Sequence, residues 1–279
     1  MKTLIKALVK QVFPGLVLRW RAGKVITSRM DPDLYLLAHF KKYLSELEGG
    51  NKFLKYFSKE NAAIDVGACG GEYSSVMASI FGRVLSVEPT SELAAVLRKS
   101  LPDNCEIFEC ALGGAPGQVA LRVPKIDGHR QHALSTVADH GFEFSNIGVV
   151  ETVIVPQLTI DQLVAERSLV PSFIKIDVEG YEGKVLDGAT KIIDTHKPVL
   201  MIEIEKRHNA QFREVFSFLS SRGYVPYHFR SGTLCLSSAA LVDESFEHLR
   251  SSDISGMMEV LASKKSERYI NNFVFLPMS

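Results

Sequence analysis

The sequence predicts an α/β protein built on a mostly parallel β-sheet with helices on both faces. From Asn61 onward, short apolar runs alternate with longer amphipathic segments, which is the strand–helix–strand order of parallel sheets. Several of these apolar runs also end in acidic residues. The carboxyl ends of neighbouring parallel strands meet at the edge of the sheet where ligands bind. The sequence therefore predicts both the fold class and the edge at which the functional site lies.

The expected strands are the short apolar runs in the second part of the chain. They are Ala62–Val66, Val84–Val87, Ile107–Cys110, Phe173–Ile176, Pro198–Ile204 and Tyr269–Leu276. Helices are expected at 73–81, 91–100, 159–167, 181–194 and 209–222 because their apolar residues recur with helical spacing. An earlier helical region is expected at 31–57, starting at Asp31-Pro32 and interrupted at Gly49-Gly50.

Two further strands are expected at 117–123 and 151–155, on either side of a polar stretch, 124–150. The polar residues of this stretch include His129, Arg130, His132, Ser135, Thr136 and His140. Such an insertion is either a solvated surface loop or a part of the binding edge.

Composition narrows the class of protein. The chain has 279 residues, of which 46% are hydrophobic and 23% charged, as in ordinary soluble globular proteins. Lys+Arg and Asp+Glu each number 32, and this balance argues against a nucleic-acid binder. The cysteines, Cys69, Cys105, Cys110 and Cys235, form no CxxC pair and suggest reduced thiols. With no apolar run of membrane-spanning length and no secretory signal, we expect a cytoplasmic protein.

Residues 1–58 are expected to form a basic N-terminal helical extension to a single domain, 59–279. Residues 1–30 contain basic side chains and no acid; the basic residues are Lys2, Lys6, Lys10, Arg19, Arg21, Lys24 and Arg29. On a helix, Lys2, Lys6 and Lys10 would form one stripe opposite an apolar face. This helix would either pack on its own domain or, through residues 1–24, lie on the anionic inner face of a membrane or under a lipid-linked substrate.

A strand-to-helix turn carries the strongest local motif. The run Ala62–Val66 contains Asp65 near its end and continues into the small residues at 67–71. Glycines in such a turn let a ligand approach the backbone. In the dinucleotide pattern G-x-G-x-x-G a glycine would stand where Asp65 does. A carboxylate at this point disfavours a pyrophosphate and suits a cationic ligand.

The next strand ends in a second acid, at Glu88-Pro89. A carboxylate at the end of the neighbouring strand can accept hydrogen bonds from both hydroxyls of a ribose. Pro89 is expected near the first turn of the following helix, where its missing N–H costs little. The two motifs together describe a nucleoside site without a phosphate cradle, and S-adenosylmethionine (SAM) fits that description.

Acidic residues also follow the later strands. Asp177, Glu179 and Glu182 come after Phe173–Ile176; we expect Asp177 to be functional and Glu182 to cap the next helix. Glu203 and Glu205 end Pro198–Ile204, and we expect only one of them to face the site. His208 is a candidate general base because an unperturbed imidazole has a pKa of about 6.5.

These motifs together resemble the FkbM-type SAM-dependent methyltransferases. The matching segments are D-x-G-A-N-x-G-x-Y-S at 65–74, E-P at 88–89, A-L-G at 111–113, V-P-x-x-T-[IL]-D-x-L at 155–163, K-I-D-V-E-G-x-E at 175–182 and the C-terminal N-F-V-F at 272–275. The resemblance covers roughly residues 60–276. One position departs from the family, since Cys69 stands where Asn is usual.

The resemblance implies a Rossmann-like class I methyltransferase fold with an antiparallel C-terminal strand. It also implies methyl transfer from SAM, usually to a hydroxyl of a sugar, glycolipid or natural product. The residues it assigns to the cofactor are Asp65, Gly67, Ala68, Gly71, Tyr73, Ser74, Glu88, Pro89 and Ala111. The acceptor hydroxyl must lose a proton, and Asp177, Glu179 and His208 are the candidate catalytic residues.

Three alternatives remain open from the sequence. A divalent metal held by Asp177, Glu203 and His208 would acidify the acceptor hydroxyl in place of a protein base. A nicotinamide-dependent oxidoreductase would share the fold class but lacks its G-x-G-x-x-G signature here. A non-catalytic SAM-binding homologue is the third alternative, and the substitution at Cys69 favours it.

Overall fold

The computed structural model describes residues 19–21, 24–26, 32–126, 129–137, 149–206, 208–230, 233–251 and 270–278. The chain divides into two compact units, Met1–Asp31 and Pro32–Ser279. In the first unit, β1 (Arg19–Arg21) and β2 (Lys24–Ile26) pair antiparallel. The amphipathic helix expected near the N-terminus lies outside the described residues, so its membrane role stays a prediction. The predicted division at 58/59 likewise stays a prediction.

The second unit contains an eight-stranded sheet in the order β13-β12-β14-β11-β10-β3-β4-β5. These strands are β13 (Thr233–Leu236), β12 (Tyr224–Arg230), β14 (Asn272–Pro277), β11 (Val199–Glu203), β10 (Pro171–Ile176), β3 (Ala62–Val66), β4 (Arg83–Val87) and β5 (Cys105–Phe108). The strands from β11 to β5 run parallel, whereas β14 is antiparallel to both β11 and β12. The predicted α/β fold, with its mostly parallel sheet and antiparallel C-terminal strand, is confirmed.

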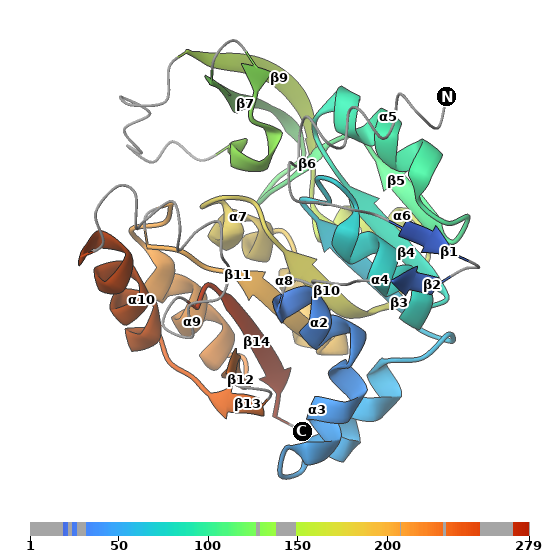
Figure 1. Cartoon of the computed structure of the whole chain (residues 1–279), viewed down its shortest axis with the longest axis vertical. Coiled ribbons are helices and arrows are strands. Elements are labelled where there is room, and N and C mark those ends of the chain that lie inside the picture. The colour runs from blue at the N-terminus through green and yellow to red at the C-terminus, as the bar shows by residue number, and fades with distance from the viewer. Residues whose placement is uncertain are drawn as a thin grey trace. The chain divides into compact units, whose positions relative to one another are not determined.

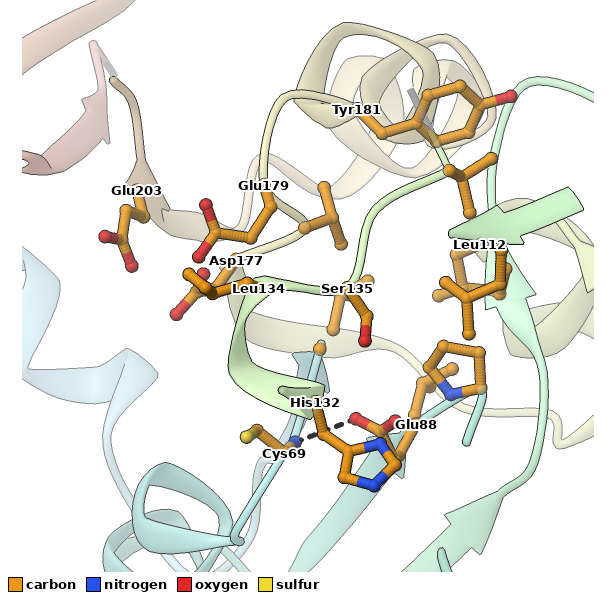
Figure 2. A pocket seen from close by; sticks show the side chains of 18 of the residues that line it. Cys69, Glu88, Leu112, His132, Leu134, Ser135, Asp177, Glu179, Tyr181 and Glu203 are labelled. Carbon is orange, nitrogen blue, oxygen red and sulfur yellow. Dashed lines mark hydrogen bonds between the residues drawn. The ribbon is translucent and has the colours of Figure 1, made fainter. Parts of the chain in front are cut away.

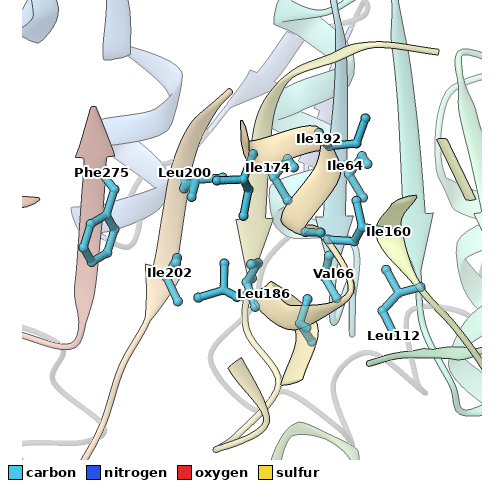
Figure 3. Close-up of a cluster of buried hydrophobic side chains, with 14 of the residues drawn as sticks. Ile64, Val66, Leu112, Ile160, Ile174, Leu186, Ile192, Leu200, Ile202 and Phe275 are labelled. Carbon is cyan, nitrogen blue, oxygen red and sulfur yellow. The ribbon is translucent and has the colours of Figure 1, made fainter. Parts of the chain in front are cut away.

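Helices surround this sheet (Figure 1). In chain order they are α2 (Pro32–Ala38), α3 (Phe40–Glu46), the 3-10 helix η1 (Gly50–Tyr56), α4 (Glu72–Ile80), α5 (Ser91–Ser100), α6 (Ile160–Glu166), α7 (Glu182–Asp187), α8 (Thr190–His196), α9 (Phe212–Ser220) and α10 (Ala240–Ser251). On one face, Ile64, Ile174 and Leu200 of the strands pack against apolar residues of α6 to α10 (Figure 3). On the other face, the rings of Phe40, Phe57 and Phe81 surround Phe173. Burial on both faces explains why the strands read as continuous apolar runs.

The helix expected at 181–194 is divided in two. It ends as α7 at Asp187 and resumes as α8 at Thr190. At Gly188 between them, a Cβ atom would lie 2.1 Å from the carbonyl oxygen of Gly113. The chain therefore turns where a neighbouring loop approaches too closely for a side chain. The helical region expected at 31–57 is similarly divided, into α2, α3 and η1.

A second, smaller sheet has the order β6-β9-β7-β8. Its strands are β6 (Ala111–Leu112), β9 (Val150–Leu158), β7 (Gly117–Ile126) and β8 (His129–Arg130). Strands β7 and β9 correspond to the two expected extra strands, and the short helix η2 (His132–Leu134) lies in the polar stretch between them. We call residues 129–137, which contain β8 and η2, the roof segment. No helix in the described part of the chain has the length and apolar character needed to cross a bilayer.

Candidate active site

A cavity of about 460 Å³ lies at the carboxyl ends of β3, β4, β10 and β11 and is also lined by the roof segment (Figure 2). One part of its lining is apolar and includes Val66, Val87, Leu112, Leu121, Val137 and Val178. The acidic residues of the lining are Glu88, just after β4, and Asp177, Glu179, Glu203 and Glu205, at or after the ends of β10 and β11. No lysine or arginine is among the described residues that line the cavity. This lining suits a ligand with a flat apolar group and a positive charge.

The turn after β3 forms the floor of the cavity. Gly67 has a φ of +82°, and a Cβ atom there would lie 1.8 Å from the carbonyl oxygen of Asp177. The amide of Asp177 donates to the carbonyl of Val66 at 3.0 Å. Only glycine permits this close contact between the turns after β3 and β10, and the contact brings the two strand ends together.

Cys69 also adopts a left-handed conformation, with a φ of +46°. Asparagine is enriched among the non-glycine residues that adopt it, which gives a backbone reason for the Asn usual at this position. Here the Cys69 amide donates to Glu88 Oε2 at 3.0 Å (Figure 2). The contact between the turn and β4 therefore uses the backbone and survives the substitution.

Glu88 lines the cavity from the end of β4 and is 5% exposed. Its Oε1 accepts a hydrogen bond from the amide of Thr90 at 2.9 Å and another from the Thr90 hydroxyl. Burial raises the pKa of this carboxyl, against these hydrogen bonds and the one from Cys69. Pro89 precedes the N-cap of α5, Thr90, and so lies just before the first turn. Among the described residues only the Cys69 amide donates to Oε2, which leaves that oxygen able to accept from a ligand.

Asp65 lies beneath the floor and does not line the cavity. Its Oδ2 accepts from the hydroxyl of Ser74 at 2.6 Å, and that hydroxyl lies 2.7 Å from the hydroxyl of Ser86. Burial raises the pKa of Asp65, and the nearby charge of Lys175 opposes the shift. Asp65 and Ser74 therefore hold the turn in place from below.

Of the other residues that the resemblance assigns to the cofactor, some line the cavity and some do not. Ala68 and Gly71, like Asp65 and Ser74, are absent from the cavity lining. The residues that do line it are Gly67, Tyr73, Glu88, Pro89 and Ala111.

Lys175 places a buried positive charge under the acidic end of the cavity. Its side chain is 1% exposed, and Nζ lies 2.7 Å from Asp177 Oδ2 and 4.1 Å from the centre of the Tyr73 ring. Burial lowers the pKa of Lys175, but the charges of Asp177, Asp65 and Glu203 raise it further than burial lowers it. The ammonium therefore stays charged and holds the Asp177 carboxylate at the cavity.

His208 lies behind the acidic lining. It is 6% exposed, and its Nε2 lies 3.1 Å from Glu179 Oε2 and 3.3 Å from Glu205 Oε2. Glu179 and Glu205 line the cavity, whereas His208 does not. Of the candidate catalytic residues, Asp177 and Glu179 therefore face a ligand, and His208 reaches one only through its carboxylate neighbours.

The expectation that only one of Glu203 and Glu205 faces the site is wrong, because both line the cavity. Side chains two residues apart in an extended segment point to the same face, so Glu203 and Glu205 can both reach the cavity. Asn271 Nδ2 donates to one carboxylate oxygen of each residue. Burial, followed by the charges of Asp177, Glu205 and Glu179, raises the pKa of Glu203 well above its usual range, which favours its protonated form.

The three residues considered as metal ligands are not gathered around one point. The His208 Nε2 lies beside Glu179 and Glu205, which are not among these three residues. Across the described ranges of the chain, no group of three His, Cys, Asp or Glu side chains is arranged to hold a metal ion.

Glu182 has the structural role expected of it. It is the first residue of α7, its Oε1 accepts from the amide of Gly180 at 2.7 Å, and Asn209 Nδ2 lies 3.1 Å from its Oε2. Burial raises the pKa of Glu182 to about 7. It lies outside the cavity lining.

Some lining residues were not assigned from the sequence. His132, Leu134 and Ser135 reach the cavity from the roof segment, and Tyr181 and Asn271 reach it from other loops. The only sequence signal for the first three was their place in a polar insertion between two strands. The described part of that insertion lines the site and is not only a solvated loop.

The strand order, the glycine turn and the acidic strand ends together define a Rossmann-like class I methyltransferase fold. A family model described as the methyltransferase FkbM domain matches residues 65–226, which is more than half of the chain. The chain belongs to the FkbM methyltransferase family, as its motifs predict. No curated protein matches it significantly.

Several solved structures are similar to this chain, each with a TM-score below 0.5. Methyltransferase FkbM from Methylobacillus flagellatus KT is 19% identical, with a TM-score of 0.46, over 83% of this chain and 47% of that chain. This chain therefore spans about half the length of that protein. An rRNA methylase from Streptococcus thermophilus is 10% identical, with a TM-score of 0.42, over 90% of this chain and 98% of the other. A geranyl diphosphate methyltransferase in complex with SAM is 12% identical, with a TM-score of 0.38, over 91% of this chain and 93% of that chain.

Proposed function

We propose that this chain transfers a methyl group from SAM to a hydroxyl oxygen of a sugar, glycolipid or natural product. Membership of the FkbM methyltransferase family supports methyl transfer. The observation that carries the cofactor assignment is the position of Glu88, whose carboxylate lines the cavity beside the glycine turn. The hydroxyl acceptor rests on the family resemblance and on the carboxylates at the other end of the cavity.

The residues present fit SAM. Glu88 is an acceptor for ribose hydroxyls, and the apolar side chains of Val87 and Leu112 suit a flat adenine ring. Asp177 offers negative charge to the sulfonium and the amino group. A lining with several carboxylates and no described basic side chain would be unfavourable for a pyrophosphate. The lining of the cavity therefore does not support the nicotinamide-dependent oxidoreductase as an alternative function.

When bound, SAM supplies an electrophilic methyl group carried by a sulfonium. The chain must align the acceptor oxygen with that methyl group and accept the hydroxyl proton. Asp177 is paired with the Lys175 ammonium at 2.7 Å, which makes it a weaker base and a better fixed negative charge. We assign proton acceptance to Glu179, and we assign His208, 3.1 Å from its Oε2, the role of holding that carboxylate in position.

Isothermal titration with SAM tests the cofactor assignment without an acceptor. Glu88→Ala should weaken SAM binding by about 1–3 kcal/mol, because ribose hydroxyls would lose their acceptor. Glu214→Ala, a change of an exposed acid on α9, is the matched control and should leave affinity unchanged. Unchanged affinity in Glu88→Ala would show that the ribose contact is misassigned. Failure of the wild-type chain to bind SAM would reject the proposal.

Methyl transfer is tested in cells with and without the gene. Mass spectrometry of their glycans, lipids and small metabolites should reveal species that are heavier by one methylene group only when the gene is present. Re-introduced Glu179→Gln should bind SAM normally in vitro and fail to restore those species. A Glu179→Gln chain that restores them fully would remove Glu179 from the proton-accepting role. A wild-type chain that binds SAM but yields no such species would favour a non-catalytic homologue.

A further inference from the structure

The roof segment brings to the cavity two buried polar atoms that have no hydrogen-bond partner in the described part of the chain. They are Nδ1 of His132 and Oγ of Ser135, and each is enclosed with no hydrogen-bond partner among the described residues. Both residues line the cavity. Buried polar atoms in folded proteins nearly always have a partner. Two such atoms on one short segment, at one cavity, indicate that a ligand supplies the missing hydrogen bonds.

The roof segment is anchored at both of its ends. Near its start, the Arg130 guanidinium pairs with Glu151 of β9 and with Glu92 of α5. Near its end, the Thr136 hydroxyl donates to the carbonyl oxygen of Glu179 at 2.8 Å. The contacts with Glu92 and Glu179 join the second sheet to α5 and to the loop after β10. They hold His132 and Ser135 in place before a ligand arrives, which lowers the entropy cost of binding.

The chemistry of the two side chains complements that of Glu88. Burial lowers the pKa of His132, so its ring is neutral near pH 7, with one nitrogen a donor and the other an acceptor. The Ser135 hydroxyl can also donate and accept. An ionised carboxylate only accepts hydrogen bonds. Figure 2 draws His132 near Glu88 and Cys69, and Ser135 farther along the roof segment, in the middle of the view. A ribose and an adenine edge require both kinds of group.

We propose that His132 and Ser135 are cofactor-binding residues, which hold the nucleoside of SAM from the roof segment while Glu88 holds it from the end of β4. This inference rests on the proposed function, because it concerns the same cavity and the same cofactor. It assigns the roof segment to cofactor recognition.

The test measures the dissociation constants of SAM and of adenosine by isothermal titration. We expect His132→Ala and Ser135→Ala each to weaken SAM binding by about tenfold, which is the usual contribution of one buried hydrogen bond to affinity. Adenosine, which lacks the amino-acid part, should lose affinity by a similar factor. His132→Asn, which retains a donor and an acceptor, should recover part of the loss. His129→Ala, an exposed histidine of the same segment, is the matched control and should bind as the wild type does.

The outcomes separate this inference from the proposed function. If the wild type binds SAM but both alanine variants bind it equally well, the roof segment does not contact the cofactor and the inference is rejected. If His129→Ala weakens binding as much as His132→Ala does, the effect is a general loosening of the segment and the inference is also rejected. If the wild type itself does not bind SAM, the proposed function fails first. Thermal unfolding of each variant verifies that it is folded, and His132→Asn serves if His132→Ala is not.

Discussion

Replacing Lys175 with Met should strongly destabilise the chain. The methionine keeps the length of the side chain and removes its charge, in a position that is 1% exposed. It leaves two carboxylates without their cation: Asp177, whose Oδ2 lies 2.7 Å from Nζ, and the buried Asp65 on the neighbouring strand. Removing one partner of a buried ion pair typically costs about 3–5 kcal/mol. We expect a loss of about 3 kcal/mol at pH 8.

The loss should depend on pH in a defined direction. Burial already raises the pKa of Asp65, and Lys175 opposes that shift, so removing the lysine raises the pKa further. A carboxyl whose pKa is raised in the folded state binds a proton more readily there than in the unfolded chain. The destabilisation of Lys175→Met should therefore shrink as the pH falls, by up to about 1.4 kcal/mol per pH unit below the raised pKa.

Urea unfolding at pH 8 and pH 5.5 measures both effects. The double variant Lys175→Met/Asp65→Asn should recover more than about 1 kcal/mol of the lost free energy of unfolding, because it removes a carboxylate together with its cation. Lys184→Met is the matched control: this lysine pairs with Asp187 at 3.1 Å but is 62% exposed, and exposed pairs contribute under about 1 kcal/mol. The reasoning is refuted if Lys175→Met costs no more than Lys184→Met, or if its cost is the same at both pH values and in the double variant.

Three further predictions concern stability. The pKa of Glu182 is about 7 in the folded chain and 4.5 by its usual value, so the wild type should lose stability as the pH rises between these values. In urea titrations, the stability of Glu182→Gln relative to the wild type should therefore increase by about 2–3 kcal/mol from pH 5 to pH 8. Gly67→Ala should lower the free energy of unfolding by at least about 2 kcal/mol, because its Cβ would meet Asp177 and its φ is positive. Gly183→Ala is the control: the space around Gly183 is open, so this variant should be neutral or slightly stabilising. His228 is buried, both of its ring nitrogens lack a partner among the described residues, and burial lowers its pKa. The wild type should therefore lose stability as the pH drops below about 6.5, and His228→Leu should lose less. Equal pH profiles for wild type and variant would contradict the first and third of these predictions.

The course of the chain was largely predictable because it depends on local patterns. Buried parallel strands need short apolar runs, and helices need a period near 3.6, so β3, β4, β5, β10 and β11 and most helices could be located. Glycine at 67 and the acids after β4 and β10 were informative for the same reason, since each follows a strand directly. Strands β12 and β13 and helix α10 lie in a region where no motif was found.

The sequence by itself determined the fold class, the family and the edge of the sheet where the acids gather, because these follow from the order and period of residue types. Tertiary structure alone decided which polar side chains reach the cavity. Asp65 turns beneath the floor toward Ser74, His208 stands behind Glu179, and the roof segment approaches from a second sheet to place His132 at the cavity. The physical reason is that each position depends on contacts between segments far apart in the sequence, and no local pattern records those contacts.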